Sequence, residues 1–238
     1  MTDSRPQAGR REIRSYILRQ GRYTVAQKNA LDQHWSHYGI EYTPEPLDFS
    51  KVFGRNSAVT LEIGFGNGES LLQQVARFPD RDFIGIEVHG PGVGHLIHRL
   101  AEQQLDNIRL IRHDAVEVLR HQVADNSLAG VQLFFPDPWH KKRHHKRRLV
   151  QPAFAELVWR KLQPGGLLHM ATDWQNYAEQ MLEVLDNAPG FTNLAGRGHF
   201  STQRGTRSET KFERRGLKLG HGVRDIMHIK SCRDAVSL

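Results

Sequence analysis

The sequence predicts an α/β fold with a doubly wound, mainly parallel sheet and helices on both faces. Short apolar runs alternate with helical patterns from about residue 58 to about residue 173, and this alternation is typical of parallel sheets. Carboxylates stand in or beside the ends of five successive runs, at Glu62, Glu87, Asp114, Asp137 and Asp173. Ligands of such sheets lie beyond the carboxyl ends of the strands, near the switch in strand order. We therefore expect these carboxylates to share one edge of the sheet.

The expected strands and helices follow one another in strict alternation. The strands lie in the segments AVTLEIGFGNG, DFIGIEV, NIRLIRHDA, SLAGVQLFFPD and GGLLHMATD. The helices lie in ESLLQQVARF, GVGHLIHRLAEQQL, AVEVLRHQV and AFAELVWRKL. The sequence contains no internal repeat, so a single sheet accounts for this part of the chain.

The N-terminal part of the chain has a different composition. Residues 1 to about 22 are rich in arginine and interrupted by glycine and proline, which predicts a mobile basic arm. Thr24 is the expected N-cap of a helix that stops near Gly39, before a proline-containing connector to about residue 50. We therefore divide the chain into residues 1–50, a basic arm and helix, and residues 51–238, the main domain.

Composition limits the classes of function. The 33 Lys and Arg exceed the 26 Asp and Glu, giving a net charge of +7, which indicates a polyanionic partner, most often nucleic acid. A solvated basic surface without a partner is the alternative. The lone Cys232 excludes an internal disulfide and argues against a cysteine-based metal site. No apolar run approaches the roughly 18 to 20 residues of a membrane span, and the N-terminus lacks a signal-peptide pattern, so a cytoplasmic location is expected.

A glycine-rich turn follows the first of these strands. Gly64, Gly66 and Gly68 are spaced G-x-G-x-G, unlike the G-x-G-x-x-G of dinucleotide-binding proteins. A tight turn needs glycine for steric reasons alone, so the spacing is not decisive by itself. Glu62 and Glu69 flank the turn and would repel a pyrophosphate, whereas a ligand with an ammonium and a sulfonium would be attracted.

Two further acids have positions that suit a nucleoside. Glu87 follows Gly64 by 23 residues at the end of the second strand, where a carboxylate can accept hydrogen bonds from ribose hydroxyls. Asp114 ends the third strand and is placed to accept from an adenine amino group. Together with the glycine turn, these acids resemble the S-adenosylmethionine site of Rossmann-like methyltransferases. The alternatives are that Glu62 is a satisfied turn residue and that Asp114 caps the following helix.

The segment Pro136-Asp137-Pro138 forms a corner after the fourth strand. Proline fixes φ and restricts the residue before it, so Asp137 is held on a stiff backbone. A carboxylate can accept two hydrogen bonds from N1–H and the exocyclic amine of guanine, which leaves N7 facing a methyl donor. Guanine N7 has a free lone pair and needs no general base. Asp137 is therefore expected to orient the base and to stabilise the positive charge that develops on its ring.

Three motifs resemble the bacterial tRNA (guanine-N7-)-methyltransferases. They are PDPWHKKRHHKRR after the fourth strand, TDW at 172–174 and TKFERRG at 210–216. The resemblance extends from about Val52 to the end of the chain. It implies S-adenosylmethionine-dependent methylation of guanine at position 46, in the variable region of tRNA, by a protein without a metal that is a monomer or weak homodimer.

The resemblance also implies roles for individual residues. The cofactor residues are the glycine turn with Glu62, Glu87, Asp114 and Asp137, and Asp137 is also the catalytic residue. The substrate residues are Lys141, Asp173, Thr210, Lys211, Phe212 and Glu213. From spacing alone, the last four also fit a helix capping box, and Asp173 also fits a helix N-cap.

The basic residues suggest how tRNA is held. The run Lys141–Arg148 and the arm Arg5–Arg22 contain most of the surplus positive charge, and we expect them to contact phosphates. A solvated charged loop is the alternative. His140, His144 and His145 have ligand-like spacing, but phosphate-facing or solvated histidines fit a basic loop better than zinc. Trp139 in the first motif and Trp174 in the second could either stack on a base or pack beneath the loops.

Three other functions remain as alternatives. The acidic corner also suits methylation of an exocyclic base nitrogen, although enzymes of that kind have both prolines after the acid or amide. A non-catalytic RNA-binding module could retain the fold, but the acids at 87, 114 and 137 argue against it. A dinucleotide oxidoreductase is disfavoured by the glycine spacing and the acidic surroundings.

Overall fold

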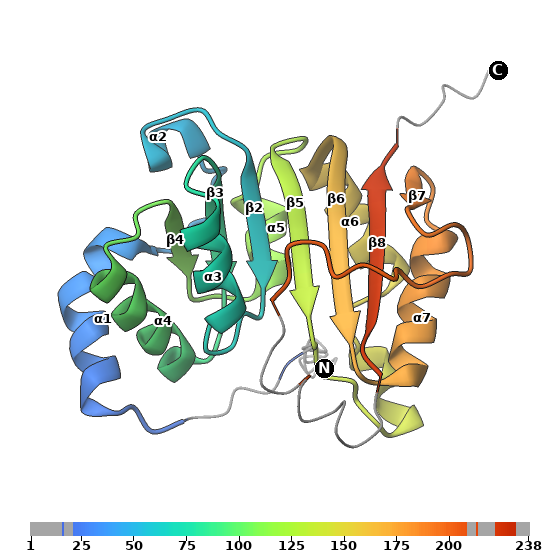
Figure 1. Cartoon of the computed structure of the whole chain (residues 1–238), viewed down its shortest axis with the longest axis horizontal. Coiled ribbons are helices and arrows are strands. Elements are labelled where there is room, and N and C mark those ends of the chain that lie inside the picture. Colours follow the sequence, from blue (N-terminus) through green and yellow to red (C-terminus); the bar gives the residue numbers. More distant parts are fainter. Residues whose placement is uncertain (1–15, 17–20, 209–212, 214–221, 232–238) are drawn as a thin grey trace, which may run out of the picture.

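Eight strands form one sheet in the computed structural model, which describes residues 16, 21–208, 213 and 222–231 (Figure 1). Their order is β1-β4-β3-β2-β5-β6-β8-β7. The pairs from β1 to β6 are parallel, and β8 is antiparallel to both β6 and β7. After β1, which lies at one edge, the chain enters the centre of the sheet at β2, moves outward through β3 and β4, and returns to β5. The sheet is thus doubly wound, as predicted, with its switch point between β2 and β5.

The strands are β1 (Gly39–Ile40), β2 (Val59–Ile63), β3 (Asp82–Ile86), β4 (Ile108–Ile111), β5 (Leu128–Phe134), β6 (Leu162–Thr172), β7 (Phe191–Asn193) and β8 (Arg224–Lys230). The helices are α1 (Val25–Tyr38), α2 (Phe49–Phe53), α3 (Glu69–Arg77), α4 (Gly90–Gln103), α5 (Ala115–His121), α6 (Pro152–Lys161), α7 (Gln175–Asp186) and the 3₁₀ helix η1 (Lys142–Arg147). All five predicted strands (β2 to β6) and all five predicted helices (α1 and α3 to α6) are present. The sequence patterns missed β1, β7, β8, α2 and α7.

Two apolar cores lie on opposite faces of the sheet. One joins α1, α3 and α4 to the strands through residues such as Phe83, Leu96 and Leu110. The other joins α5, α6 and α7 through residues such as Leu61 and Val158. Strand β3 is buried along its whole length, as expected for a parallel strand with both faces covered. None of the described helices has the length and apolar character needed to span a bilayer.

Helix α1 begins and ends where its local chemistry predicts. Thr24 Oγ1 accepts from Gln27 N, and Gln27 Oε1 accepts in return from Thr24 N at 2.9 Å, which is a capping box. The helix ends at Gly39. It packs against α4 so closely that a Cβ on Gly94 would lie 2.7 Å from the Gln27 carbonyl oxygen. Helix α1 and β1 are thus attached to the sheet, and the domain boundary at residue 50 stays a prediction.

A chain segment, rather than a helix, covers one face of β5, β6 and β8. Residues 201–207 cross the sheet there (Figure 1). Thr206 Oγ1 donates to Gln74 Oε1 at 2.9 Å, and Gln74 is paired through its amide with Gln132 of β5. Gly205 lies against His169 of β6 and Met227 of β8. This segment brings Arg207 to the carboxyl end of β5, where its guanidinium lies over the rings of the last aromatic residues.

Candidate active site

Parallel strands bring the predicted acids to one edge of the sheet. Strands β2, β5 and β6 point toward the lower edge in the view of Figure 1, and β8 runs the opposite way. Because β3 and β4 are parallel to β2, their carboxyl ends lie at the same edge. The acids at or just after these ends are Glu62, Glu87, Asp114, Asp137 and Asp173. The shared edge is therefore the part of the protein in which a ligand would meet all of these elements.

The glycine turn between β2 and α3 borders open space. Gly64, Gly66 and Gly68 have φ angles of 70°, 61° and 76°, a region that favours glycine. A Cβ on Gly64 or Gly66 would meet no atom of the described residues within 4 Å, whereas a Cβ on Gly68 would lie 2.7 Å from Leu96. The first two glycines thus leave room for a ligand close to the backbone, and the third allows α4 to pack.

Glu87 holds this turn in place. Its Oε2 accepts from Gly66 N at 2.9 Å, and its Oε1 accepts from the backbone N–H groups of Val88 and His89. A carboxylate offers about four acceptor positions. With three of them in use, about one position on Oε2 remains for a ligand. The expected pair of ribose hydroxyls would therefore find one direct acceptor here rather than two.

Glu62 is a buried acid without a complete set of partners. Its side chain is 3% exposed, and Oε2 has no hydrogen-bond partner among the described residues. Burial, and then the nearby charge of Glu87, raise the pKa of Glu62 to about 8. The alternative that Glu62 is a satisfied turn residue is therefore wrong. At neutral pH its carboxyl is mostly protonated, and a cationic group placed beside it would favour the charged form.

Asp114 is the N-cap of α5, as the structural alternative predicted. Its Oδ1 accepts from Val116 N at 2.8 Å and from Glu117 N at 3.3 Å. Only Oδ1 is used in this cap. Oδ2 is left as an acceptor, so capping and binding an amino group are compatible in one side chain.

The corner after β5 is strained as well as stiff. Phe135 and Trp139 have φ angles of 50° and 47°, and non-glycine residues in this region cost on the order of 1 to 3 kcal/mol each. Phe135 N donates to Ala171 O of β6 at 2.8 Å, which ties the corner to the next strand. Asp137 is exposed and has no hydrogen bond to the described residues. Its carboxylate is therefore free to accept from a ligand.

The predicted substrate residues are distributed along this edge and beyond it. Lys141 is exposed at the start of η1, and Asp173 is exposed before α7. Asp173 does not cap α7: the N-cap residue is Trp174, whose N–H donates to Thr172 Oγ1 at 3.2 Å. The predicted substrate residues Thr210, Lys211 and Phe212 lie outside the described residues.

Glu213 is buried in an ion-pair network. Its side chain is 2% exposed and pairs with Arg207, and Arg204 approaches it at 3.3 Å. Arg207 also donates two hydrogen bonds to Asp225, at 2.9 and 2.8 Å. Although burial favours the neutral acid, bonds from His169 and Arg207 lower the pKa of Asp225. The structure thus places Glu213 against a buried arginine, and sequence reasoning missed both Arg207 and Asp225.

The basic run after the corner separates into two groups. Lys142, Arg143, Lys146 and Arg147 are exposed on η1, where phosphates could reach them. Arg148 is 2% exposed, and its Nε donates to Pro138 O at 2.9 Å. The expectation that the whole run contacts phosphates is therefore wrong for Arg148, because its guanidinium faces the protein interior.

The aromatic residues near the corner also differ. Trp139 packs against Arg147, 4.9 Å from its ring centroid, and against His144. Trp174 is 39% exposed and contacts His140 edge to face at 4.2 Å. Trp139 thus follows the packing alternative, and Trp174 keeps a surface on which a base could stack. Within the described ranges, no group of three or more His, Cys, Asp or Glu could hold a metal ion.

Comparisons with known proteins agree with this geometry. A family model described as "Putative methyltransferase" matches residues 56–226. A tRNA (guanine-N(7)-)-methyltransferase from Alcanivorax borkumensis is 58% identical over 230 residues, covering 96% of each chain. Proteins of the same name from Stutzerimonas stutzeri and Shewanella denitrificans are 58% and 55% identical, covering 92% and 91% of each chain. The chain belongs to the bacterial tRNA (guanine-N7-)-methyltransferase family.

Solved structures with little sequence identity share the fold of this family member. The 16S rRNA methyltransferase KamB is 14% identical with a TM-score of 0.58, covering 77% of this chain and 92% of its own. A 16S rRNA (adenine(1408)-N(1))-methyltransferase from Catenulisporales acidiphilia is 15% identical with a TM-score of 0.52, covering 81% of this chain and 94% of its own. The predicted Rossmann-like methyltransferase fold is thus confirmed.

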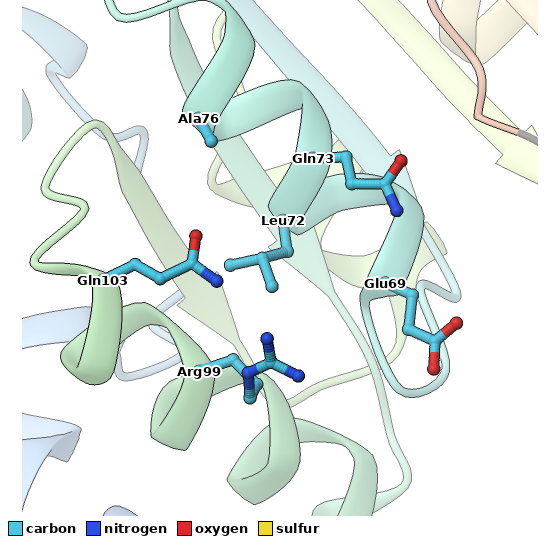
Figure 2. Close-up of a pocket in the computed structure, with 6 residues that line it drawn as sticks. All are labelled: Glu69, Leu72, Gln73, Ala76, Arg99 and Gln103. Carbon is cyan, nitrogen blue, oxygen red and sulfur yellow. The ribbon is translucent and has the colours of Figure 1, made fainter.

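A groove on this family member is lined by the two helices that follow β2 and β3. It has a volume of about 260 Å³ between α3 and α4 (Figure 2). Figure 2 shows Leu72 between the two helices, with Arg99 and Gln103 of α4 facing it. The lining residues are Glu69, Leu72, Gln73, Ala76, Arg99 and Gln103. This set includes Glu69, which adjoins the glycine turn, and none of the five acids at the strand ends.

The unpartnered carboxyl of Glu62 leads to a prediction about stability. An acid whose pKa is raised in the folded state stabilises the fold fully below its unfolded value, 4.5, and this contribution is lost as pH rises through about 8. Glu62→Gln mimics the protonated acid at every pH. The ligand-free variant should be more stable than the wild type by about 2 kcal/mol or more above pH 8, with the difference vanishing toward acid pH. Urea unfolding across this range measures it, and an equal difference at all pH values would contradict the assignment.

Proposed function

We propose that this chain transfers a methyl group from S-adenosylmethionine to N7 of guanine at position 46 in the variable region of tRNA, in the cytoplasm. The observation that carries the proposal is a free carboxylate, Asp137, on a strained corner beside an open glycine turn surrounded by acids. Membership of the family supports the chemistry. The choice of position 46 rests on the resemblance of the three motifs.

The cofactor would lie against the glycine turn. Glu62 has a free oxygen for an ammonium group, Glu87 has about one acceptor left for ribose, and Asp114 Oδ2 suits an adenine amino group. Asp137 lies at the same edge and adds a further negative charge. When bound, S-adenosylmethionine supplies an electrophilic methyl group on a sulfonium. Clustered carboxylates favour such a cation electrostatically.

Asp137 would position the nucleotide. Its two oxygens accept from N1–H and the exocyclic amine of guanine, which fixes the ring and directs N7 toward the methyl group. N7 attacks with its own lone pair, so no protein group removes a proton. Positive charge would move to the ring as the N–C bond forms and the sulfur–methyl bond breaks, leaving a neutral thioether, and the carboxylate of Asp137 would stabilise that charge.

The tRNA would be held by cations and by substrate residues around the corner. Lys142, Arg143, Lys146 and Arg147 are exposed on η1 and are suited to phosphates. Lys141 and Asp173 flank the corner from η1 and α7. We retain the segment 210–213 as a substrate element, in which buried Glu213 would anchor the segment rather than touch the nucleotide.

Mapping the modified nucleotide tests the function directly. The protein is incubated with bulk tRNA and S-adenosylmethionine labelled in its methyl group, and the labelled nucleotide is identified and located. The expected product is N7-methylguanine at position 46. A methyl group on an exocyclic base nitrogen would instead establish the amino-methyltransferase alternative. If no tRNA nucleotide is labelled, a non-catalytic RNA-binding module would be favoured.

The role of Asp137 predicts the effect of a conservative substitution. Asp137→Asn keeps the shape of the side chain but supplies one acceptor oxygen where two donors need one each. Turnover at saturating substrates should fall by about 10²- to 10³-fold, the usual effect of removing a preorganised electrostatic group. The matched control is Asp80→Asn, because Asp80 is an exposed acid just before β3, at the opposite edge of the sheet. Normal turnover by Asp137→Asn would reduce Asp137 to a structural loop residue.

A further inference from the structure

Arg148 connects the corner after β5 with the start of α7. Its Nε donates to Pro138 O at 2.9 Å, immediately after the acid of the corner. Its Nη1 donates to Gln180 Oε1 at 2.6 Å and its Nη2 to Asn176 Oδ1 at 2.9 Å, both on α7. The guanidinium also lies over the Tyr177 ring, 4.7 Å from the centroid. One side chain thus bonds to two segments that are far apart in the sequence.

The burial of Arg148 excludes an ordinary phosphate contact. The side chain is 2% exposed, so a phosphate could not reach it without the loop opening. Its remaining close contact is His145 Nε2 at 3.1 Å, and the described residues give it no carboxylate partner. Burial lowers the pKa of Arg148. Placing a charged group here costs free energy, so the geometry that its planar fork imposes must matter to the protein.

The corner needs such support because its backbone is strained. Trp139 has a φ of 47°, and the bond from Arg148 fixes the carbonyl that precedes it. At the other end, Arg207 lies over the Phe135 ring at 5.6 Å, and Phe135 has a φ of 50°. Strained backbone persists only where surrounding contacts determine it. Arg148 therefore holds one end of the corner in its observed conformation.

The other segment bonded to Arg148 carries a second acid. Asp173 and Trp174 immediately precede α7, and Asn176 is in the first turn of that helix. Fixing α7 against Pro138 therefore also fixes the turn that carries Asp173 relative to the corner that carries Asp137. Small errors in such a separation are costly, because a displacement of about 1 Å can reduce a rate about 10²-fold.

We propose that Arg148 is a positioning residue that sets the separation of Asp137 and Asp173 for methyl transfer, and that it is not a phosphate ligand. This proposal rests on the proposed function, in which Asp137 positions the nucleotide and Asp173 is a substrate residue beside the corner. It also divides the basic run by role: the exposed cations of η1 bind tRNA, and the final arginine holds the active site together.

Two substitutions of Arg148 separate positioning from phosphate binding. Arg148→Lys keeps the charge but loses the planar fork of donors, so turnover at saturating tRNA and cofactor should fall by about 10²-fold. Arg148→Gln removes the charge and should leave the slope of log affinity against log salt unchanged. Lys146→Ala, an exposed cation of the same loop, should reduce that slope by about 0.7 to 0.9.

A pair of exposed residues on α7 provides a milder test. Asn176→Ala removes an acceptor of Arg148 from the protein surface, and turnover should fall several-fold. Gln175→Ala is the matched control, because its side chain bonds to Glu179 and not to Arg148. Its turnover should equal that of the wild type. If the Arg148 variants do not fold, this pair decides the proposal, and equal turnover of the two α7 variants would overturn it.

Amide hydrogen exchange separates this proposal from the proposed function. Exchange in residues 139–141 and 173–175 should be faster in Arg148→Lys and Asn176→Ala than in Gln175→Ala, whatever reaction the protein catalyses. An inactive wild type with this exchange pattern would refute the proposed function and keep the link between the segments. The positioning role would be overturned if Arg148→Lys had full turnover. It would also be overturned if Arg148→Gln reduced the slope of log affinity against log salt as much as Lys146→Ala does.

Discussion

The burial of Glu62 beside a second acid, Glu87, at the carboxyl edge of the sheet is the constraint on which the site depends. Strands β2 and β3 are parallel, and Glu62 is paired with Gly85. Glu87 follows two residues later, just after β3, and its charge adds to the cost of ionising the buried Glu62. Glu87 accepts three backbone hydrogen bonds. Glu62 has no such set and is held neutral, with a pKa of about 8. The edge is thereby prepared for a ligand that brings positive charge.

The arginines around the corner are divided between buried and exposed positions. Arg148 and Arg207 are buried at the two ends of the strained corner. Arg148 donates to Pro138 O, Arg207 lies over the Phe135 ring, and Asp137 is left free. The arginines and lysines of η1 are exposed. Backbone strain and a buried charge both destabilise a fold, and strained residues cluster at functional sites. The combination of the two at this corner therefore supports the corner as the centre of the chemistry.

The parts of the structure that could be predicted from the sequence are those set by local patterns. Apolar runs gave the five parallel strands, and Thr24 and Gly39 gave both ends of α1, because each signal depends on residues close in the chain. Strand β8 was missed since its buried Asp225 and His228 find partners on other elements, so its sequence does not look apolar. The same reason hid the burial of Arg148 and Glu213. Whether a charged residue is buried depends on partners that are distant in the sequence, and local sequence patterns do not identify those partners.

Proton release on cofactor binding tests the central claim most directly. Free Glu62 is mostly protonated at pH 7 because its pKa is about 8, and an ammonium beside it would favour the charged form. Titration calorimetry with S-adenosylmethionine, in buffers of different ionisation enthalpy, should therefore show release of about one proton by the wild type. On binding, the Glu62→Gln variant should release about one proton fewer than the wild type. A binding heat that is independent of the buffer in the wild type would show that the edge does not couple its acids to a cationic ligand.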